Sequence, residues 1–404
     1  MTMAEPESVS RFRKFLQINT MHPTPDYKAS AEFLVSQATE IGLDYKVLEL
    51  VKDKHLVIMK LPGSDPSLKS IMLNSHTDVV PVFEEFWTYP PFSAERVQIE
   101  NGDYKIYARG AQDMKVTCSL YLEALRLIAS SGIKLKRNVF AIFSPDEEIG
   151  GEDGMQKFVE TKEFADMNVG FDLDEGRVSV KNLNNFQFAE RTISQVIFTA
   201  HGNTGHGSQF IEGTAIEKLL PLINELMDKR EQEKKKLLEI EENGLNYKIG
   251  EVTSINLTQL SGGKQPNVVP ATYSVTFDIR VTPNEDLEEF RDYLRKLAEK
   301  NNCDMTLLRP NEQRSITKID KSNKFIAAFY ETIESRDIEI VPIISPGATD
   351  ARHVRTKGIP AFGFNPLRNH EYLAHAHNEY ILESAFLYGI DVYFDMIQKL
   401  ANAD

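Results

Sequence analysis

One short stretch, residues 71–81, constrains the fold more than any other part of the chain. Its apolar start predicts a buried strand, which ends at His76, and Asp78 follows where the chain leaves the sheet. In a parallel α/β sheet the loops beyond the strand ends carry function. A histidine held there is suited to bind a metal, and Asp78 is suited to orient its ring through the second nitrogen. Alone, the pattern also fits a hydrogen-bonded surface histidine.

Acidic residues recur where the next predicted strands end. Asp113 follows a turn that contains Gly110, Glu147 and Glu148 follow one apolar run, and Glu175 follows the next. Each of these acids alone is typical of a turn or a solvated surface. Their joint occurrence at successive strand ends predicts that several strands deliver carboxylates to one edge of a sheet.

Together with His76 and a histidine of the stretch 375–379, these carboxylates form a complete ligand set for two divalent ions. Two ions about 3.5–4 Å apart need a bridging carboxylate, further carboxylates and histidines. Nitrogen and oxygen ligands without cysteine favour zinc, and they leave manganese and cobalt open.

The pattern changes near residue 189. Predicted elements then run in the order strand, helix, strand, strand, helix, strand, which indicates a small α+β layer inserted into a larger domain. We therefore expect an α/β protein whose catalytic domain, residues 1–188 and 311–404, has a mixed sheet flanked by helices. Residues 189–310 are expected to form an inserted, ferredoxin-like α+β domain.

Composition excludes several other classes of protein. A length of 404 residues favours two domains, and the net charge of −14 argues against nucleic acid as a partner. Only Cys118 and Cys303 occur, which fits a reducing compartment. Residues 1–10 lack the apolar core of a signal peptide, and no run approaches the ~20 apolar residues of a membrane span. We expect a cytoplasmic protein with no membrane partner.

The whole chain resembles the M20 family of metallopeptidases and amidohydrolases, and within it the eukaryotic aminoacylase branch. The resemblance is carried by five motifs, at residues 75–81, 109–113, 146–151, 174–176 and 375–379. It implies a zinc-peptidase-like catalytic domain, an inserted domain that serves dimerisation, and hydrolysis of N-acyl-L-amino acids.

The resemblance also implies residue roles, with two zinc ions per subunit. Asp113 would bridge the two ions, and Glu147 would be the general base. The motif His-x-x-Asn/Asp-Glu selects His375 over His377. Asp78 would be the partner of His76. The implied ligands are His76, Asp113 and Glu175 for one zinc, and Asp113, Glu148 and His375 for the other.

In this family the inserted domain supplies a donor histidine from the partner subunit, and His206 matches it. A homodimer through the inserted domain is therefore expected. Asn267, Arg280 and Arg352 match positions near the substrate, and Arg352 is the candidate for the substrate carboxylate. The resemblance further implies a cis peptide bond after Asp113. A structural loop histidine and local ion pairs are the alternatives for these residues.

Three other functions remain to be compared with hydrolysis of N-acyl amino acids. A dipeptidase or another exopeptidase would use the same metal site. A non-catalytic binding relative should lack Glu147 or a ligand, and this chain has all of them. A dinucleotide enzyme is disfavoured because no G-x-G-x-x-G follows a predicted strand.

Overall fold

The computed structural model describes residues 4–241 and 247–404. Residues 1–3 of the N-terminal stretch and residues 242–246 of the predicted inserted domain lie outside the described part. The chain divides into two compact units. Unit 1 comprises Met1–Phe188, Thr317–Pro342 and Thr349–Asp404, and unit 2 comprises Ala189–Ile316 and Ile343–Ala348.

Unit 1 is built on a mixed sheet whose central strands are parallel. In sheet order the strands are β1 (Asp44–Val51), β2 (Lys54–Leu61), β6 (Val139–Ser144), β3 (Ser70–His76), β7 (Val169–Asp174), β18 (Ala361–Phe364) and β8 (Asn184–Glu190). Strand β8 pairs with β18 and also with β16 (Ser315–Ile316) and β17 (Ile340–Ser345).

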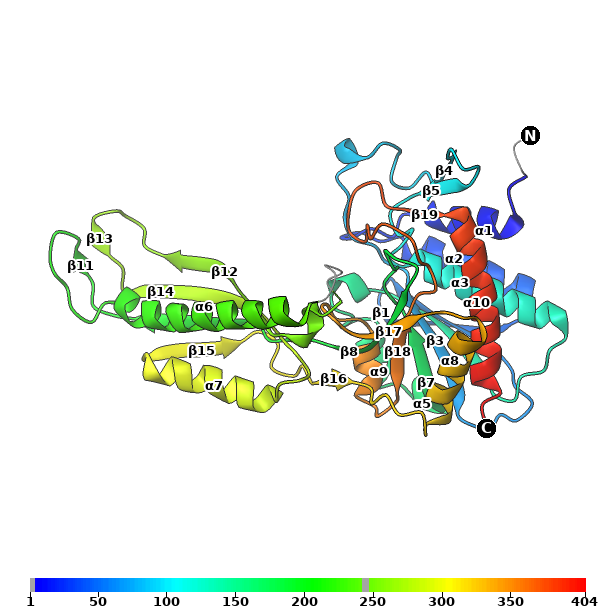
Figure 1. The fold of residues 1–404 in the computed structure, drawn as a ribbon. Coiled ribbons are helices and arrows are strands. Elements are labelled where there is room, and N and C mark those ends of the chain that lie inside the picture. Colours follow the sequence, from blue (N-terminus) through cyan, green and yellow to red (C-terminus); the bar gives the residue numbers. More distant parts are fainter. Residues whose placement is uncertain (1–3, 242–246) are drawn as a thin grey trace. The chain divides into compact units, whose positions relative to one another are not determined.

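Helices cover both faces of this sheet because its central strands are apolar on both sides. Ile71 and Leu73 of β3 pack into one core, and Met72 between them packs into the other. The first face carries α1 (Glu7–Leu16), α2 (Tyr27–Ile41), α3 (Lys115–Ser131), α8 (Lys324–Ser335) and α10 (Glu383–Ala401) (Figure 1). The second carries α4 (Met155–Phe158), α5 (Lys162–Asp166) and α9 (Ala351–Arg355).

A separate three-stranded sheet of unit 1 holds the segment that leads to Asp113. Its order is β19 (Tyr380–Leu382), β5 (Tyr104–Tyr107) and β4 (Glu95–Gln98). The loop before it contains one short 3-10 turn, η1 (Glu84–Phe86), and a second, η2 (Glu147–Ile149), follows β6. Strands β4 and β5 are not among the elements that the sequence predicts.

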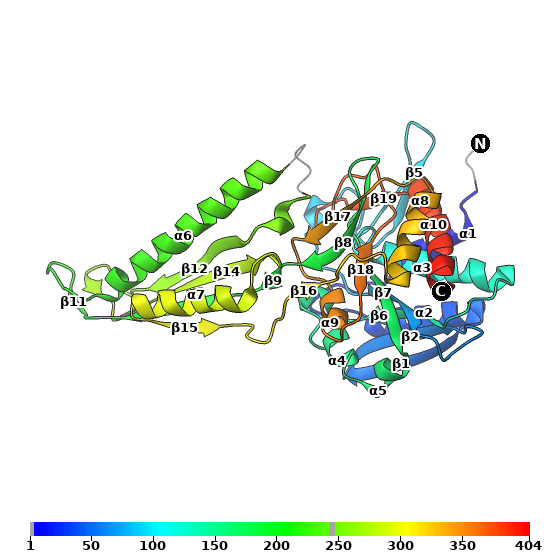
Figure 2. The ribbon, with the colours of Figure 1, turned by 60° about the horizontal axis from the view of Figure 1, so that its bottom comes forward.

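Unit 2 has the predicted order of strands and helices. Its sheet runs β12 (Ser254–Gly262), β14 (Thr272–Val281), β10 (Val196–His201) and β15 (Cys303–Leu307), and β9 (Thr192–Ile193) pairs with β14. Helices α6 (Ala215–Ile240) and α7 (Leu287–Lys300) pack on one face of this sheet around a core of their own (Figure 2). A two-stranded ribbon, β11 (Gly205–His206) with β13 (Val268–Val269), and the turn η3 (Ile249–Glu251) complete the unit.

The helices that the structure describes were compared with the requirements of a membrane span. None of them combines the length and the apolar character needed to cross a bilayer.

Candidate metal centre

His76 ends β3 with its ring fixed in one orientation. Its Nδ1 lies 3.1 Å from the main-chain oxygen of Asp78, which can only accept, so Nδ1 carries the proton. In the neutral ring the lone pair is then on Nε2, the nitrogen that faces the carboxylates. Nε2 lies 3.4 Å from Asp113 Oδ1 and 3.8 Å from Glu175 Oε2. This is the tautomer that binds a metal through Nε2.

The two oxygens of Asp113 face two different histidines. Oδ1 faces His76, and Oδ2 lies 3.2 Å from His375 Nε2. His375 Nε2 also lies 3.1 Å from Glu148 Oε2. The peptide bond between Asp113 and Met114 is cis, as the resemblance implies. The cluster is thus two groups of donors that share Asp113.

The donors fit a divalent metal. His76 Nε2 and Glu148 Oε1 are buried atoms with no hydrogen-bond partner among the described residues. Ligand atoms of His76, Asp113 and Glu148 lie within 4.8 Å of one another, as do those of His76, Glu147 and Glu175. Buried polar atoms are normally paired. Imidazole nitrogens with carboxylate oxygens are a donor set that zinc accepts.

The cluster carries an excess of negative charge. Burial, and after it the Glu175 carboxylate, raises the pKa of Glu147 well above its ordinary value. Burial and the nearby Asp113 raise the pKa of Glu175 to about 8. Asp113 and Glu148 raise the pKa of His375 to about 10. A bound divalent cation would lower the pKa values of these carboxylates, because its positive charge favours their ionised forms.

Asp78 makes contacts beyond its predicted one with His76. Its carboxylate lies 3.5 Å from His76 Nδ1, farther than its own main-chain oxygen does. The carboxylate oxygens accept the backbone N–H groups of Glu147 at 3.2 Å and Glu148 at 3.1 Å. Oδ2 also lies 2.9 Å from His22 Nε2. Asp78 therefore holds the loop that presents Glu147 and Glu148.

A buried ion pair positions the turn that carries Asp113. Arg109 Nη1 donates to Glu379 Oε2 at 2.6 Å. The other oxygen of Glu379 accepts the backbone N–H of Gln112 at 2.5 Å and that of Asp113 at 3.1 Å. Arg109 and Glu379 lie within the motifs at residues 109–113 and 375–379, which predict no role for them. The sequence feature that could have identified Arg109 and Glu379 is a charged residue within a motif that the fold buries.

Two further residues, His22 and Tyr27, support the centre without being predicted from the sequence. Tyr27 donates its hydroxyl to Asp146 Oδ1 at 2.6 Å and accepts the Asp146 N–H at 2.9 Å. Asp146 has a left-handed backbone, with φ of 65°, which only surrounding contacts can hold. His22 and Tyr27 lie 56 and 119 residues from the side chains that they contact, so no local spacing reveals them.

In unit 2 the structure brings His206 and Asn267 together. The Gly207 N–H donates to the Asn267 oxygen at 2.8 Å, and His206 pairs with Val268 across the ribbon. The Ser208 N–H donates to His206 Nδ1 at 3.2 Å, so in the neutral ring Nε2 carries the proton. His206 is exposed. Its side chain therefore offers an N–H donor to the outside of the unit.

The two predicted arginines are already engaged. Arg280 Nε donates to Asp278 Oδ1 at 2.8 Å. Arg352 is only 6% exposed, and it donates to the carbonyl oxygens of Thr349 at 2.9 Å and Gly150 at 2.7 Å. Contacts with Gly150 place the Arg352 guanidinium against the loop that follows Glu148.

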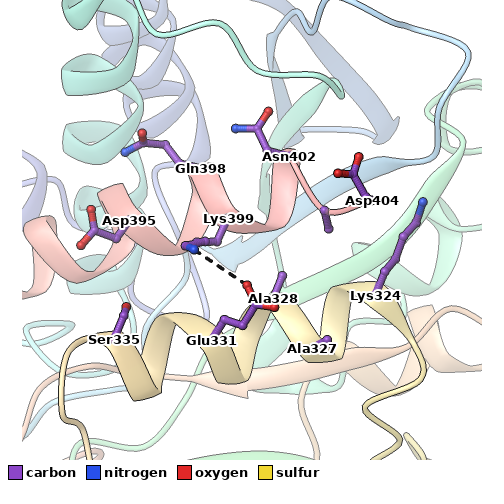
Figure 3. Close-up of a pocket in the computed structure, with 11 residues that line it drawn as sticks. Lys324, Ala327, Ala328, Glu331, Ser335, Asp395, Gln398, Lys399, Asn402 and Asp404 are labelled. Carbon is purple, nitrogen blue, oxygen red and sulfur yellow. Dashed lines mark ion pairs between the residues drawn. The ribbon is translucent and has the colours of Figure 1, made fainter.

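A hollow of about 730 Å³ lies elsewhere in unit 1, between α8 and α10 (Figure 3). Lys399 and Glu331 form an ion pair across it at 3.8 Å. The residues that line it include no histidine or cysteine; they are Lys324, Ala327, Ala328, Glu331, Ser335, Asp395, Gln398, Lys399, Asn402, Ala403 and Asp404. Its charges of both signs do not form a metal site.

Comparison with known proteins points to one family. The model of peptidase family M20/M25/M40 matches residues 72–399. The chain is 42% identical to aminoacylase-1 of Dictyostelium discoideum over 100% of both chains. It is 40% identical to aminoacylase-1 of Mus musculus, over 100% of this chain and 98% of that protein. An M20 family metallo-carboxypeptidase from Sulfolobus solfataricus has the same fold, with a TM-score of 0.75, 18% identity, and coverage of 98% of this chain and 99% of that one.

Proposed function

Since this chain belongs to peptidase family M20/M25/M40, we propose that it hydrolyses N-acyl-L-amino acids to a carboxylate and a free L-amino acid. The observation that carries this proposal is the similarity to two aminoacylase-1 proteins over the full length of the chain. The chain is a metal-dependent amidohydrolase, and all the candidate ligands of its centre are present in unit 1.

We infer that the metal is zinc, with two ions per chain. His76, Asp113 and Glu175 would hold one ion, and Asp113, Glu148 and His375 the other. The opposite orientation of the two Asp113 oxygens supports its role as the bridge. When bound, such a pair supplies the positive charge that activates a water molecule and polarises an amide carbonyl.

Glu147 is the proposed general base. It is 9% exposed and its pKa is raised by burial and by Glu175, which suits a carboxylate that must both take and return a proton. Glu147 takes a proton from the attacking water as the C–O bond forms. It then delivers that proton to the nitrogen of the leaving amino acid as the C–N bond breaks.

His206 is the proposed donor to the oxygen that becomes negative during attack. Its protonated Nε2 and its exposure support this role. A preorganised donor at such an oxygen typically contributes about 10²–10³-fold in rate. Following the family, we infer that His206 serves the metal centre of a partner subunit.

The proposed homodimer forms through unit 2. Strand β12 is an edge strand, and from its third residue onward it is exposed, with Leu260 58% exposed. Helix α6 carries another exposed leucine, Leu220. Unpaired edges with apolar side chains are normally covered in native proteins. A second copy of unit 2 would cover both the β12 edge and the exposed leucines.

Asn267, Arg280 and Arg352 remain proposed substrate-side residues. Asn267 lies on the same ribbon as His206, which supports a shared role. Arg280 would have to exchange part of its contact with Asp278 for the substrate. Arg352 would contact the substrate from its position against the loop that follows Glu148, where it donates to the Gly150 carbonyl oxygen.

We also infer a cytoplasmic location. Cys118 and Cys303 are both free, as expected in a reducing compartment.

The test is hydrolysis of a panel of N-acetyl-L-amino acids against the matching unblocked dipeptides, with zinc measured in the same preparation. We expect the N-acetyl substrates to be preferred in kcat/KM. A preparation that cleaves only the dipeptides would instead identify the exopeptidase activity that the family also contains.

A further inference from the structure

The loop that carries Glu147, residues 146–153, is closed by one side chain from a distant part of the sequence. Lys54, the first residue of β2, contacts the carboxylate of Asp146 at the start of this loop. The same ammonium group donates to Asp153 Oδ2 at 2.8 Å at the end of the loop. Lys54 therefore bridges the two ends of residues 146–153, which we call the base loop.

Asp146 depends on this bridge more than Asp153 does. Asp146 is 1% exposed, and among the described residues the other side chain that its carboxylate contacts is Tyr27, whose hydroxyl donates at 2.6 Å. Asp153 is paired with a second cation, Lys157, at 2.5 Å. A buried carboxylate that loses its counter-ion is unfavourable unless it reaches water or takes up a proton. Removal of Lys54 is therefore expected to displace Asp146 first.

Displacement of Asp146 would alter the backbone that leads into Glu147. The left-handed conformation of Asp146, with φ of 65°, is uncommon for a residue other than glycine and is held by its surroundings. Its main-chain oxygen accepts the Gly151 N–H at 2.7 Å, which ties the later part of the loop to its start. A change in the Asp146 backbone therefore changes the direction in which Glu147 leaves the loop.

The Glu147 carboxylate relies on this backbone because it has few contacts of its own. Within residues 4–241 and 247–404 the structure gives it no hydrogen bond, and it lies 3.8 Å from His76 Nε2. The Glu148 carboxylate, by contrast, lies 3.1 Å from His375 Nε2. The position of the base loop should therefore matter more for Glu147 than for the proposed metal ligand Glu148.

We propose that Lys54 is a positioning residue for the hydrolysis: by bridging Asp146 and Asp153 it keeps the base loop closed and directs the Glu147 carboxylate toward the attacking water. This inference rests on the proposed role of Glu147 as general base. Burial lowers the pKa of Lys54, but hydrogen bonds with the two aspartates outweigh burial and raise the pKa overall, so the bridging group stays a cation. A base must lie within hydrogen-bond reach of the proton that it takes, so a small shift of the loop lowers the rate.

The test is Lys54→Met, which keeps an unbranched side chain but removes the charge and the donors. We expect kcat to fall about 10- to 100-fold, as for misplacement of a catalytic group. KM and zinc per chain should stay within about twofold of the wild type, since neither substrate binding nor a metal ligand is removed. Lys54→Arg should recover most of the loss because a guanidinium can contact two carboxylates.

Lys46→Met is the matched control. Lys46 lies on the neighbouring strand β1 and pairs with Glu163 at 2.8 Å, outside the base loop. This variant loses the same kind of ion pair in the same unit, and it should keep the wild-type kcat.

A double-mutant cycle separates positioning of the base from a general structural effect. If Lys54 acts through Glu147, Lys54→Met should lower the residual kcat of Glu147→Gln by less than about twofold. A structural role would lower kcat in both backgrounds. Equal losses in both backgrounds, a loss of zinc that parallels kcat, or an unchanged kcat in Lys54→Met would each overturn the proposal.

Asp153→Asn keeps the proposal testable if Lys54→Met does not fold. The Asp153 side chain is 32% exposed, so this variant should fold, and it opens the bridge at one end. We expect kcat to fall about 3- to 10-fold, as for one charge-assisted hydrogen bond, with no further loss in the Glu147→Gln background. An unchanged kcat in Asp153→Asn would reject a bridge across the loop.

The same cycle separates this proposal from the proposed function. It is run on N-acetyl-L-methionine, or on a dipeptide if the wild-type protein cleaves only dipeptides, since the base loop serves either substrate. Near-normal turnover in Glu147→Gln alone would reject the proposed base. An inactive Glu147→Gln combined with additive losses would reject the role of Lys54 and leave the proposed function in place.

Discussion

The metal-ligand cluster of unit 1 and the surface of unit 2 differ in which kind of group is in an unfavourable environment. The cluster buries groups that water would solvate, among them Glu147 and the Nε2 atom of His76. Unit 2 exposes apolar side chains, since Phe210, four residues after His206, is fully exposed and Leu260 is 58% exposed. Buried charge calls for a counter-charge, and exposed apolar surface calls for a cover.

This difference indicates what each region lacks. Unit 1 positions its polar groups through Asp78 and the Arg109–Glu379 pair, as the supports of metal ligands commonly do. Unit 2 packs its own core around α6 and α7 but leaves the β12 edge open. We therefore propose that unit 1 binds the metal and that unit 2 mediates assembly.

The largest effect is expected for Glu147→Gln, which tests whether Glu147 transfers a proton or binds the metal. Because Glu147 is assigned to proton transfer, the variant should lose about 10²–10⁴-fold in kcat. Zinc content, measured by atomic emission, should stay at the wild-type level. Exposed Glu100→Gln is the control for the same substitution. Near-normal turnover in Glu147→Gln would remove this residue from the mechanism.

The role of unit 2 is tested by mixing variants. His206→Ala should lose about 10²–10³-fold in kcat, as for the loss of one oxyanion donor. In heterodimers with Glu147→Gln, the His206→Ala chain keeps its base and borrows His206 from its partner. One complete centre is then restored, and co-expression should recover a substantial fraction of the activity. If purified heterodimers remain as inactive as both parents, His206 does not act between subunits.

A smaller effect is expected for residues that position the metal ligands without binding the metal themselves. Glu379→Gln weakens the hold on the Asp113 turn, and zinc affinity should fall about 10- to 100-fold in chelator competition. Glu383→Gln is the matched control, because Glu383 pairs with Arg96 at 2.6 Å in the same unit. Equal zinc affinity in the two variants would show that the Arg109–Glu379 pair serves folding alone.

The smallest effect concerns the N-terminal segment. His22→Ala removes one partner of the Asp78 carboxylate, which keeps two backbone N–H donors. We expect kcat/KM to fall by up to about 10-fold, since one hydrogen bond to a charged group is lost. His22→Gln should restore the activity because its amide can donate to Asp78. If glutamine does no better than alanine, the contact does not position the loop.

These tests separate what local sequence can and cannot reveal. The buried strands β3, β6 and β7 were predictable because each combines an apolar run with an acid or histidine at its end. The short strands β4 and β5 were not, since four residues give too little periodicity. Helix α9 was missed for the same reason.

Within the centre, the ligand candidates follow from strand ends, but their supports do not. His22 and Tyr27 meet their partners through tertiary contacts that no spacing encodes. The atom that accepts from His76 Nδ1 also needed the fold, because the nearer acceptor is the main-chain oxygen of Asp78 and not the predicted carboxylate.

The central claim is that divalent metal held by unit 1 carries the hydrolysis, and one titration tests it directly. Zinc is added to verified metal-free protein while bound zinc and N-acetyl-L-methionine turnover are measured in the same sample. We expect no turnover without metal, full recovery as the second zinc per chain binds, and the same two-zinc binding without recovery in Glu147→Gln. Full activity in the metal-free protein would contradict the account.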